Sequence, residues 1–142
     1  MSEPNSNATI PRGRALWLVT ISYVMALFAG GLTILYAPIE DPLWLTLAAD
    51  AVATIVIFGW SVAYDNSSFY DAYWSVIPIA IVLYWASLAG ADVPGLRIAG
   101  ISLVVAVWGA RLTWNWARGW TGLDHEDWRY VDFRTQFPRT YW

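Results

Sequence analysis

The sequence predicts an all-α membrane protein, a polytopic bundle of four transmembrane spans followed by a C-terminal interfacial helix. The chain has 142 residues, of which 58% are hydrophobic, and its mean hydropathy is +0.43. A soluble domain of this length cannot enclose so much apolar surface. The apolar residues fall into four long runs, and several of the eleven tryptophans lie near the ends of these runs. Because amphipathic rings favour the headgroup layer, this placement is typical of membrane spans.

The charges and the missing residue types exclude several functions. Eight basic residues, all arginine, stand against eleven acidic ones, which gives a formal net charge of −3. Neither a nucleic-acid-binding surface nor a polybasic lipid-binding patch is expected from this balance. The chain has no cysteine, so disulfides, zinc-thiolate sites and thiol catalysis are excluded. His125, Glu126 and Asp127 are adjacent, but neighbouring helical positions point about 100° apart, and we expect no metal site there.

The first two spans follow a polar N-terminal tail. Residues 1–14 contain two prolines and several Asn and Ser residues, and we expect a disordered cytoplasmic tail there. Residues 15–37 carry no charge and are long enough to cross a hydrocarbon core of about 30 Å at about 1.5 Å per residue. The turn that follows is too short for anything but an antiparallel return, so residues 43–64 form the second span.

Asp50 is the unusual residue of the second span. A carboxyl group in the hydrocarbon costs roughly 2.5–3.5 kcal/mol on insertion scales, so such residues are usually paired or functional. One interpretation is a protonated Asp50 that hydrogen-bonds Thr46 or Thr54, one helical turn away. In the other interpretation, the carboxyl group binds a substrate or takes part in proton transfer.

A polar and aromatic segment, residues 65–78, separates the second span from the third. Ser68 and Asp71 form a capping-box pattern, which predicts a short helical turn beginning at Ser68. Ser75 can cap the next helix, with Pro78 in the first turn, where a missing N–H costs little. These side chains are either interfacial anchors of a connecting loop or the groups of a site at the membrane surface. The residues that the segment would present are Tyr70, Asp71, Tyr73 and Trp74.

The remaining spans are residues 75–90 and 98–116, so residues 15–116 form the bundle. The first and fourth spans each carry small residues at four-residue spacing, which suits close packing against a neighbouring helix. Residues 117–142 form a cytoplasmic interfacial segment, in which residues 126–135 can fold as a surface helix. The small residues are Ser22, Ala26 and Gly30 in the first span and Ser102, Ala106 and Ala110 in the fourth.

The distribution of arginines predicts the orientation in the membrane. With four spans, seven of the eight arginines fall on the side of the two termini, and Arg97 falls on the other. The positive-inside rule then places both termini in the cytoplasm. Residues 65–74 share that face, so we expect Asp71 to pair with Arg111 or Arg129. The seven arginines are Arg12, Arg14, Arg111, Arg118, Arg129, Arg134 and Arg139.

Three motifs in the same order resemble those of one family. They are Asn-x-Ser-x-Tyr-Asp-x-Tyr-Trp-Ser-Val-x-Pro at 66–78, Trp-Gly-x-Arg-Leu-Thr at 108–113 and His-Glu-Asp-Trp-Arg-Tyr at 125–130. Together they resemble the uncharacterised integral-membrane proteins that are grouped with steroid 5-alpha-reductases. The resemblance covers residues 43–142, whereas such proteins continue for roughly as many residues again. The chain therefore resembles an N-terminal half.

This resemblance implies an NADPH-dependent reductase that acts on a conjugated carbon–carbon double bond of a lipid or steroid-like substrate. Tyr70 and Tyr73 are then candidate catalytic donors to a substrate carbonyl, with Asp71 as a third catalytic residue that orients a tyrosine. Asp50 and Trp74 are candidate substrate-binding residues. Most of the NADPH site would lie beyond residue 142. The candidates for cofactor binding in this chain are Arg111, Arg118, Arg129 and Tyr130.

A non-enzymatic function is the alternative. Arginines at a cytoplasmic boundary and interfacial tyrosines also follow from topology alone, and we expect the chain to be inactive by itself. The alternative is a four-helix membrane module that serves as a subunit, a lipid-binding module or an assembly partner. The expected partners are the lipid bilayer, a lipophilic small molecule and either a C-terminal half or a second copy of the chain.

Overall fold

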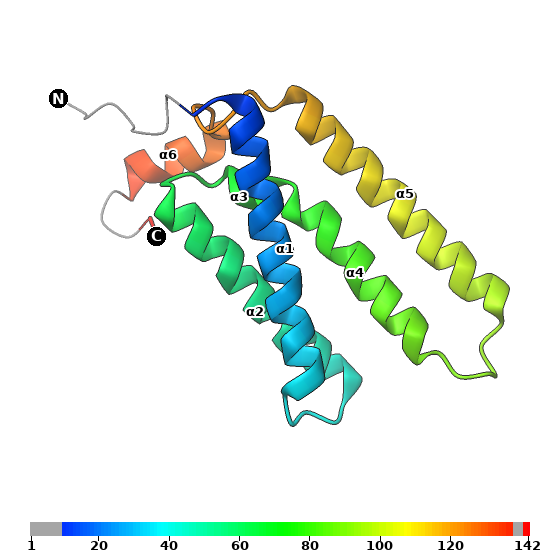
Figure 1. Cartoon of the computed structure of the whole chain (residues 1–142). Helices are drawn as coiled ribbons and strands as arrows, with labels where there is room; N and C mark the ends of the chain where they lie inside the picture. The colour runs from blue at the N-terminus through cyan, green and yellow to red at the C-terminus, as the bar shows by residue number, and fades with distance from the viewer. Residues whose placement is uncertain (1–9, 138–140) are drawn as a thin grey trace.

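The computed structural model describes residues 10–137 and 141–142, and these residues form helices and connections without a strand. In Figure 1, α1 lies against α2 and α4 lies against α5, while α3 and α6 gather at one end of the long helices. The predicted all-α fold is confirmed. The helices are α1 (Arg12–Tyr36), α2 (Pro42–Ala63), α3 (Ser68–Asp71), α4 (Tyr73–Leu88), α5 (Gly95–Gly119) and α6 (Trp128–Gln136).

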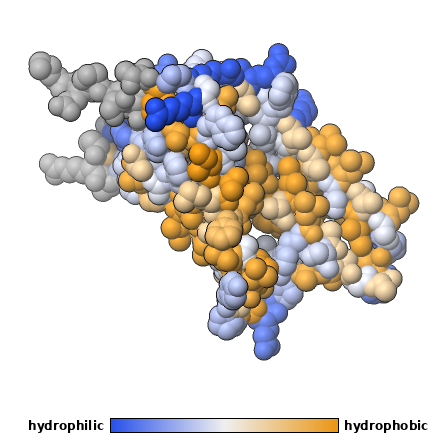
Figure 2. All heavy atoms as spheres, in the orientation of Figure 1, coloured by the Kyte–Doolittle hydropathy of each residue, from blue (hydrophilic) through white to orange (hydrophobic). Residues whose placement is uncertain are grey.

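Four helical segments are long and apolar enough to cross a membrane, namely α1, α2, α3 together with α4, and α5. Figure 2 shows hydrophobic residues over the middle of the molecule and hydrophilic residues at the ends of the helices. Large apolar side chains point outward, as Phe28 does with 66% of its surface exposed and Ile55 with 67%. Contiguous exposed apolar surface of this kind is unfavourable in water. The molecule therefore fits a lipid bilayer.

The helix ends differ from the predicted ends by a few residues. α1 begins at Arg12, three residues before its predicted start, and the Arg12 side chain is fixed by tertiary hydrogen bonds. Its Nη2 donates to the carbonyl oxygen of Ala117 at 2.6 Å, and its Nε donates to that of Trp120 at 2.8 Å. These bonds tie the start of α1 to the end of α5, so both lie at the same end of the bundle. Residues 1–9 of the predicted tail lie outside the described residues.

The serines in the 65–78 segment do not act as the predicted caps. α3 begins at Ser68, as predicted, but the Ser68 hydroxyl donates to the carbonyl oxygen of His125 at 3.0 Å. α4 begins at Tyr73, so Ser75 and Pro78 lie inside the helix rather than at its start. The prediction was wrong on these caps because a local pattern takes no account of partners on other segments.

Small residues set the spacing between α1 and α2. Ser22, Ala26 and Gly30 are all buried, as their four-residue spacing predicts. A Cβ atom at Gly30 would lie 3.2 Å from the carbonyl oxygen of Ala49 and 3.6 Å from the Cβ atom of Ala53. The two backbones therefore approach each other closely at this point.

The contact between α4 and α5 uses a different residue from the predicted one. Gly109 is the buried residue of α5, whereas Ala110, which the spacing assigned to the contact, is exposed. One turn further along α5, the Thr113 hydroxyl shares a hydrogen bond of 2.8 Å with that of Ser75. Of the predicted ridge, Ser102 and Ala106 are half-buried, and only Ala110 is replaced in the contact, by its neighbour Gly109.

Candidate functional site

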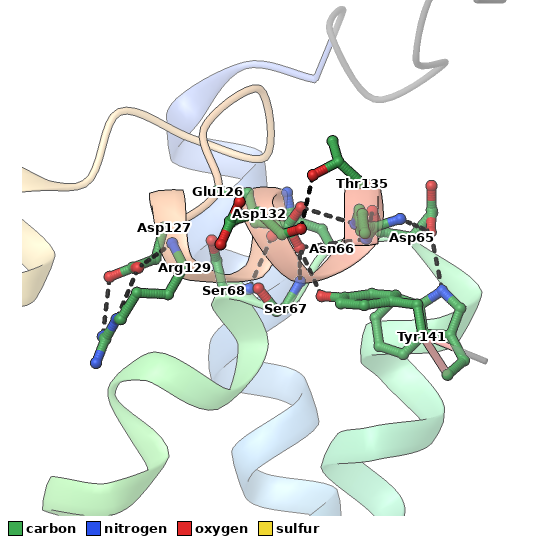
Figure 3. Close-up of polar contacts among 12 residues, drawn as sticks. Asp65, Asn66, Ser67, Ser68, Glu126, Asp127, Arg129, Asp132, Thr135 and Tyr141 are labelled. Carbon is green, nitrogen blue, oxygen red and sulfur yellow. Dashed lines mark hydrogen bonds and ion pairs between the residues drawn. The ribbon is translucent and has the colours of Figure 1, made fainter. Parts of the chain in front are cut away.

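Hydrogen bonds hold the segment after α2 against the loop before α6 (Figure 3). The side-chain amide of Asn66 donates to the carbonyl oxygens of Leu123, at 2.9 Å, and His125, at 3.4 Å. The Ser68 hydroxyl donates to the same oxygen of His125. Asn66 and Ser68 are both buried, so each of these bonds replaces water that the group has lost. Two of the three sequence motifs are thereby brought into contact.

Arg134 of α6 completes this contact. Its guanidinium binds the carboxylate of Asp65 through Nη1 and the Asp65 carbonyl oxygen through Nη2, and its Nε lies 2.9 Å from Glu126 Oε2. Glu126 Oε1 in turn accepts the backbone N–H of Ser67 at 2.8 Å. The Tyr141 ring packs against the guanidinium, with its centroid 4.4 Å away. Burial opposes the charge of Arg134, but the hydrogen bonds to Asp65 and Glu126 prevail and raise its pKa.

Asp127 fixes the start of α6. Its carboxylate accepts the backbone N–H of Arg129 at 2.9 Å, which is an N-cap, and also binds the Arg129 guanidinium at 2.9 and 3.0 Å. The side-chain hydrogen bond from Arg129 is the main cause that lowers the pKa of Asp127, and the backbone bond adds to it. The Arg129 guanidinium is therefore bound by the N-cap residue of its own helix.

Four polar side chains meet where α2 faces α3 and α4, and we refer to Asp50, Thr54, Tyr70 and Tyr73 as the polar cluster. The Tyr73 hydroxyl donates to Asp50 Oδ1 at 3.4 Å, and Tyr70 and Tyr73 both lie beside Thr54. The two tyrosine rings stack with centroids 5.6 Å apart. Asp50 thus bonds Tyr73 rather than Thr46 or Thr54, the two expected partners. The Thr46 hydroxyl instead donates to the carbonyl oxygen of Pro42 and accepts from Nε1 of Trp85.

A cavity of about 360 Å³ lies on one side of the polar cluster, among α1, α2 and α4; we refer to it as the membrane cavity. Its walls are mostly apolar, with Ala26 and Gly30 from α1 and Ile77 and Ala80 from α4. Asp50 is the charged residue in its described lining. The volume lies within the range of small-molecule sites, which is about 300–1,000 Å³. The arrangement can hold an apolar molecule with one polar group against Asp50.

A second cavity, of about 530 Å³, lies between the last half of α2 and α6; we refer to it as the end cavity. Phe58 and Phe133 contribute to its walls from these two helices. Thr54 and Tyr70 of the polar cluster also line it. Because Asp50 lines the membrane cavity and Thr54 lines the end cavity, the polar cluster lies between the two.

The predicted catalytic residues are not all brought together. Tyr70 and Tyr73 stack in the polar cluster. Asp71 instead lies near the side chain of Trp116 on α5, but the indole N–H of Trp116 forms no hydrogen bond with it. The predicted ion pair between Asp71 and Arg111 or Arg129 is wrong: Asp71 forms no ion pair with a described residue. Arg129 forms its ion pair with Asp127, two residues earlier in the sequence.

The other predicted site residues are dispersed. Arg111 and Arg118 lie exposed on α5, and Tyr130 lines the end cavity. Trp74 is 60% exposed and packs edge-on against Tyr70, with ring centroids 5.1 Å apart, but it does not line either of the two cavities. None of the three predicted cofactor-binding arginines, Arg111, Arg118 and Arg129, lines either of these cavities.

Sequence reasoning did not single out Arg134, and it named Thr54 only as a partner of Asp50, not of the two tyrosines. Arg134 pairs with Glu126, eight residues earlier and before the start of α6, and with Asp65, so the three- and four-residue spacings of a helix gave no signal for it. Phe133 and Phe137 are four residues apart, which indicated that the C-terminal helix has an apolar face turned toward the bundle. Thr54 carried no such signal, because its tyrosine partners lie on other helices.

Comparison with known proteins places most of the chain within one sequence family. Residues 57–142 match the family described as "Protein of unknown function (DUF1295)". An uncharacterized protein of Schizosaccharomyces pombe (strain 972) is 28% identical over 126 residues. The match covers 87% of this chain and 37% of that relative, so the chain spans little more than a third of the relative's length. No solved structure matches the chain.

Proposed function

Because the chain belongs to the DUF1295 family, whose function is unknown, we propose its function from its own geometry: it binds a lipophilic small molecule that carries a carbonyl oxygen. The membrane cavity is the observation that carries this proposal. It has about 360 Å³ and apolar walls, and it lies among helices that fit a bilayer. Burial of apolar surface favours a lipid-soluble ligand in such a space.

Tyr73 would supply the hydrogen-bond donor for the carbonyl oxygen. Its hydroxyl lies 3.4 Å from Asp50 Oδ1, which is long for an O–H···O bond, whose usual distance is about 2.7–2.8 Å. A ligand oxygen beside the Tyr73 hydroxyl could take over this hydrogen from Asp50 at a shorter distance. Since Tyr73 is only 2% exposed, that bond would form away from water, where hydrogen bonds are stronger. Tyr73 does not itself line the membrane cavity, so its hydroxyl would reach the ligand beside Asp50, the lining residue to which it is bonded.

We further propose that this binding serves a reductase in a longer protein, as the resemblance to steroid 5-alpha-reductase-like proteins implies. The substrate would carry a carbon–carbon double bond conjugated to the carbonyl. When such a bond is reduced, negative charge develops on the carbonyl oxygen, and a donor directed at that oxygen stabilises it. We assign this role to Tyr73, whose hydroxyl is bonded to the lining residue Asp50 and whose ring stacks on Tyr70.

Two of the arginines at the polar end are already engaged and are not free to bind the phosphate groups of NADPH. Arg129 is bound by Asp127, and Arg134 is bound by Asp65 and Glu126. Arg111 and Arg118 lie exposed on α5. We therefore expect NADPH to bind this chain weakly or not at all by itself. The residues that hold the cofactor would come from the remainder of a longer protein.

A lipid-binding subunit without catalysis is the second candidate, and the unsuitable arginines favour it for this chain alone. It would use the same cavity and the same ligand chemistry. Both functions are compatible with a partner that packs along α5, because only 6% of the apolar segment of this helix is buried within the chain. A C-terminal half or a second copy of the chain would fit that place.

Ligand binding to a cavity-filling variant tests the proposal. Gly31 lines the membrane cavity and Gly59 does not, and a Cβ atom at either position would meet nothing within 4 Å. Gly31→Leu should lower the binding of radiolabelled cholest-4-en-3-one, in nanodiscs of phosphatidylcholine, by at least tenfold. Gly59→Leu is the matched control and should bind as the wild type does. Equal binding by both variants would contradict the proposed site.

A further inference from the structure

Ser67 has a buried hydroxyl group that lacks a partner. The residue is 5% exposed, and its Oγ makes no hydrogen bond to the part of the chain that the structure describes. The Tyr141 side chain lies nearby without closing this gap. Buried hydroxyls are nearly always hydrogen-bonded, so such an exception needs an explanation. Ser67 lines the end cavity, and a ligand in that cavity would supply the missing partner.

The walls of the end cavity restrict the class of ligand. Phe58, Phe133, Phe137 and Trp142 contribute aromatic rings, which favour stacked or edge-on contact with a flat ring. The described lining contains no charged residue. An ionised ligand would lose its water there without gaining a partner.

The charged and titratable groups around the cavity agree with an uncharged ligand. Arg134 packs against Tyr141 and Trp142, but its guanidinium is already bound by carboxylates and is not available to an anion. Burial is the main cause that raises the pKa of Tyr130 and of Tyr141. Both phenols therefore keep their protons at neutral pH, and the Tyr141 hydroxyl donates to Glu126 Oε1 at 3.5 Å.

We propose that the end cavity is a second ligand site, which binds an uncharged ring compound whose oxygen accepts a hydrogen bond from Ser67. The polar cluster separates this site from the membrane cavity, so the two sites can be occupied independently. The proposal does not depend on the function of the membrane cavity.

Photolabelling of the purified full chain with benzophenone, a neutral two-ring ketone, tests this site. Benzophenone should label peptides from residues 54–61 and 130–137, as mapped by mass spectrometry. Excess 9-fluorenone should suppress this labelling at a concentration about threefold to tenfold below that needed for fluorene, the same ring system without the oxygen. Labelling spread evenly over the lipid-facing helices would overturn the proposal, as would equal competition by the two compounds.

Two pairs of variants make the result specific. Ser67→Ala should abolish the advantage of fluorenone over fluorene, whereas Ser87→Ala, at an exposed serine bonded within its own helix, should retain it. Ser61→Leu, which fills the end cavity from α2, should lower the labelling while the far-ultraviolet circular dichroism stays unchanged. Gly31→Leu in the membrane cavity should leave the labelling intact. An unaltered fluorenone advantage in Ser67→Ala, or labelling lost in Gly31→Leu, would show that the ligand lies elsewhere.

Discussion

Arg134 is the side chain through which α6 is fixed to the rest of the chain. In its pair with Glu126, the two side chains are only 25% and 12% exposed. Arg129 forms a pair of the same length, 2.9 Å, with Asp127, but its side chain is 62% exposed. Water and salt screen an exposed pair far more strongly than a buried one. The two arginines of α6 therefore differ in what they contribute, although their contacts look alike.

Removal of Arg134 should destabilise the protein much more than removal of Arg129. Arg134→Ala leaves the carboxylate of Glu126 buried without its cation, which should lower the free energy of unfolding by about 1–3 kcal/mol. Arg129→Ala, the matched control on the same helix, should cause a clearly smaller loss. Unfolding in detergent, followed by circular dichroism, measures both. Equal losses would show that the Arg134 pair is as exposed as the other.

The N-cap of α6 should be lost in acid. In the unfolded chain the pKa of Asp127 is about 3.9, and hydrogen bonds from Arg129 lower it in the folded state. The stabilisation by this carboxylate is therefore fully present above about pH 3.9 and is lost as the pH falls through the lower folded-state pKa. The NMR signals of the Asp127 carboxyl and the Arg129 amide should titrate together below that pH. In Asp127→Asn the amide should not titrate, and a transition of the wild-type amide above about pH 5 would contradict the cap.

Helix α5 is held close to α4 at a single glycine. A Cβ atom at Gly109 would collide with the carbonyl oxygen of Ser75 and lie 2.8 Å from Cδ1 of Ile79. Gly100, on the same helix, has nothing within 4 Å of such an atom. The closest approach of these two helices is therefore at Gly109, next to the Thr113–Ser75 hydrogen bond, whereas Gly100 faces open space.

Gly109→Ala should force α4 and α5 apart and lower the free energy of unfolding by about 1–3 kcal/mol, because the colliding atom belongs to the backbone. Gly100→Ala should instead be neutral or stabilising by up to about 1 kcal/mol, since alanine is the better helix former. Thermal unfolding of both variants in the same detergent compares them directly. A stable Gly109→Ala protein would mean that the two helices do not pack as described.

The elements could be predicted from the sequence more completely than their partners. Long apolar runs determine that α1, α2 and α5 exist, because the length of a run and the absence of charge are local properties. The partner of Asp50 could not be predicted, because Tyr73 lies 23 residues away on another helix. A helical pattern covers only contacts three or four residues apart. For the same reason, the caps assigned to Ser68 and Ser75 were wrong.

At the scale of the whole molecule, the polar contacts gather at one end. Arg12 joins the start of α1 to the end of α5, and Asn66 joins the segment after α2 to the loop before α6. The two other turns, which contain Glu40 and Asp92, lie at the opposite ends of their helices. Four antiparallel spans place these two sets of residues on opposite sides of a bilayer. The positive-inside rule predicts that the end with Arg12 is cytoplasmic.

Introduced cysteines can test this topology, because the chain has no cysteine of its own. His125→Cys should react with a membrane-impermeant maleimide from the cytoplasmic side. Glu40→Cys and Asp92→Cys should react only from the opposite side. All three residues have exposed side chains. Reaction of His125→Cys and Asp92→Cys from the same side would contradict the four-span arrangement.

Infrared difference spectroscopy of a bound ligand tests the central claim, that Tyr73 holds a carbonyl oxygen in the membrane cavity. Cholest-4-en-3-one labelled with carbon-13 at the carbonyl would be bound to the wild type and to Tyr73→Phe, which keeps the ring and its packing. In the wild type the carbonyl stretch should lie at lower frequency than in the bilayer, because a hydrogen bond weakens the double bond. In Tyr73→Phe it should return to the bilayer value, with binding weaker by about threefold to tenfold. The same frequency and affinity in both proteins would contradict the claim.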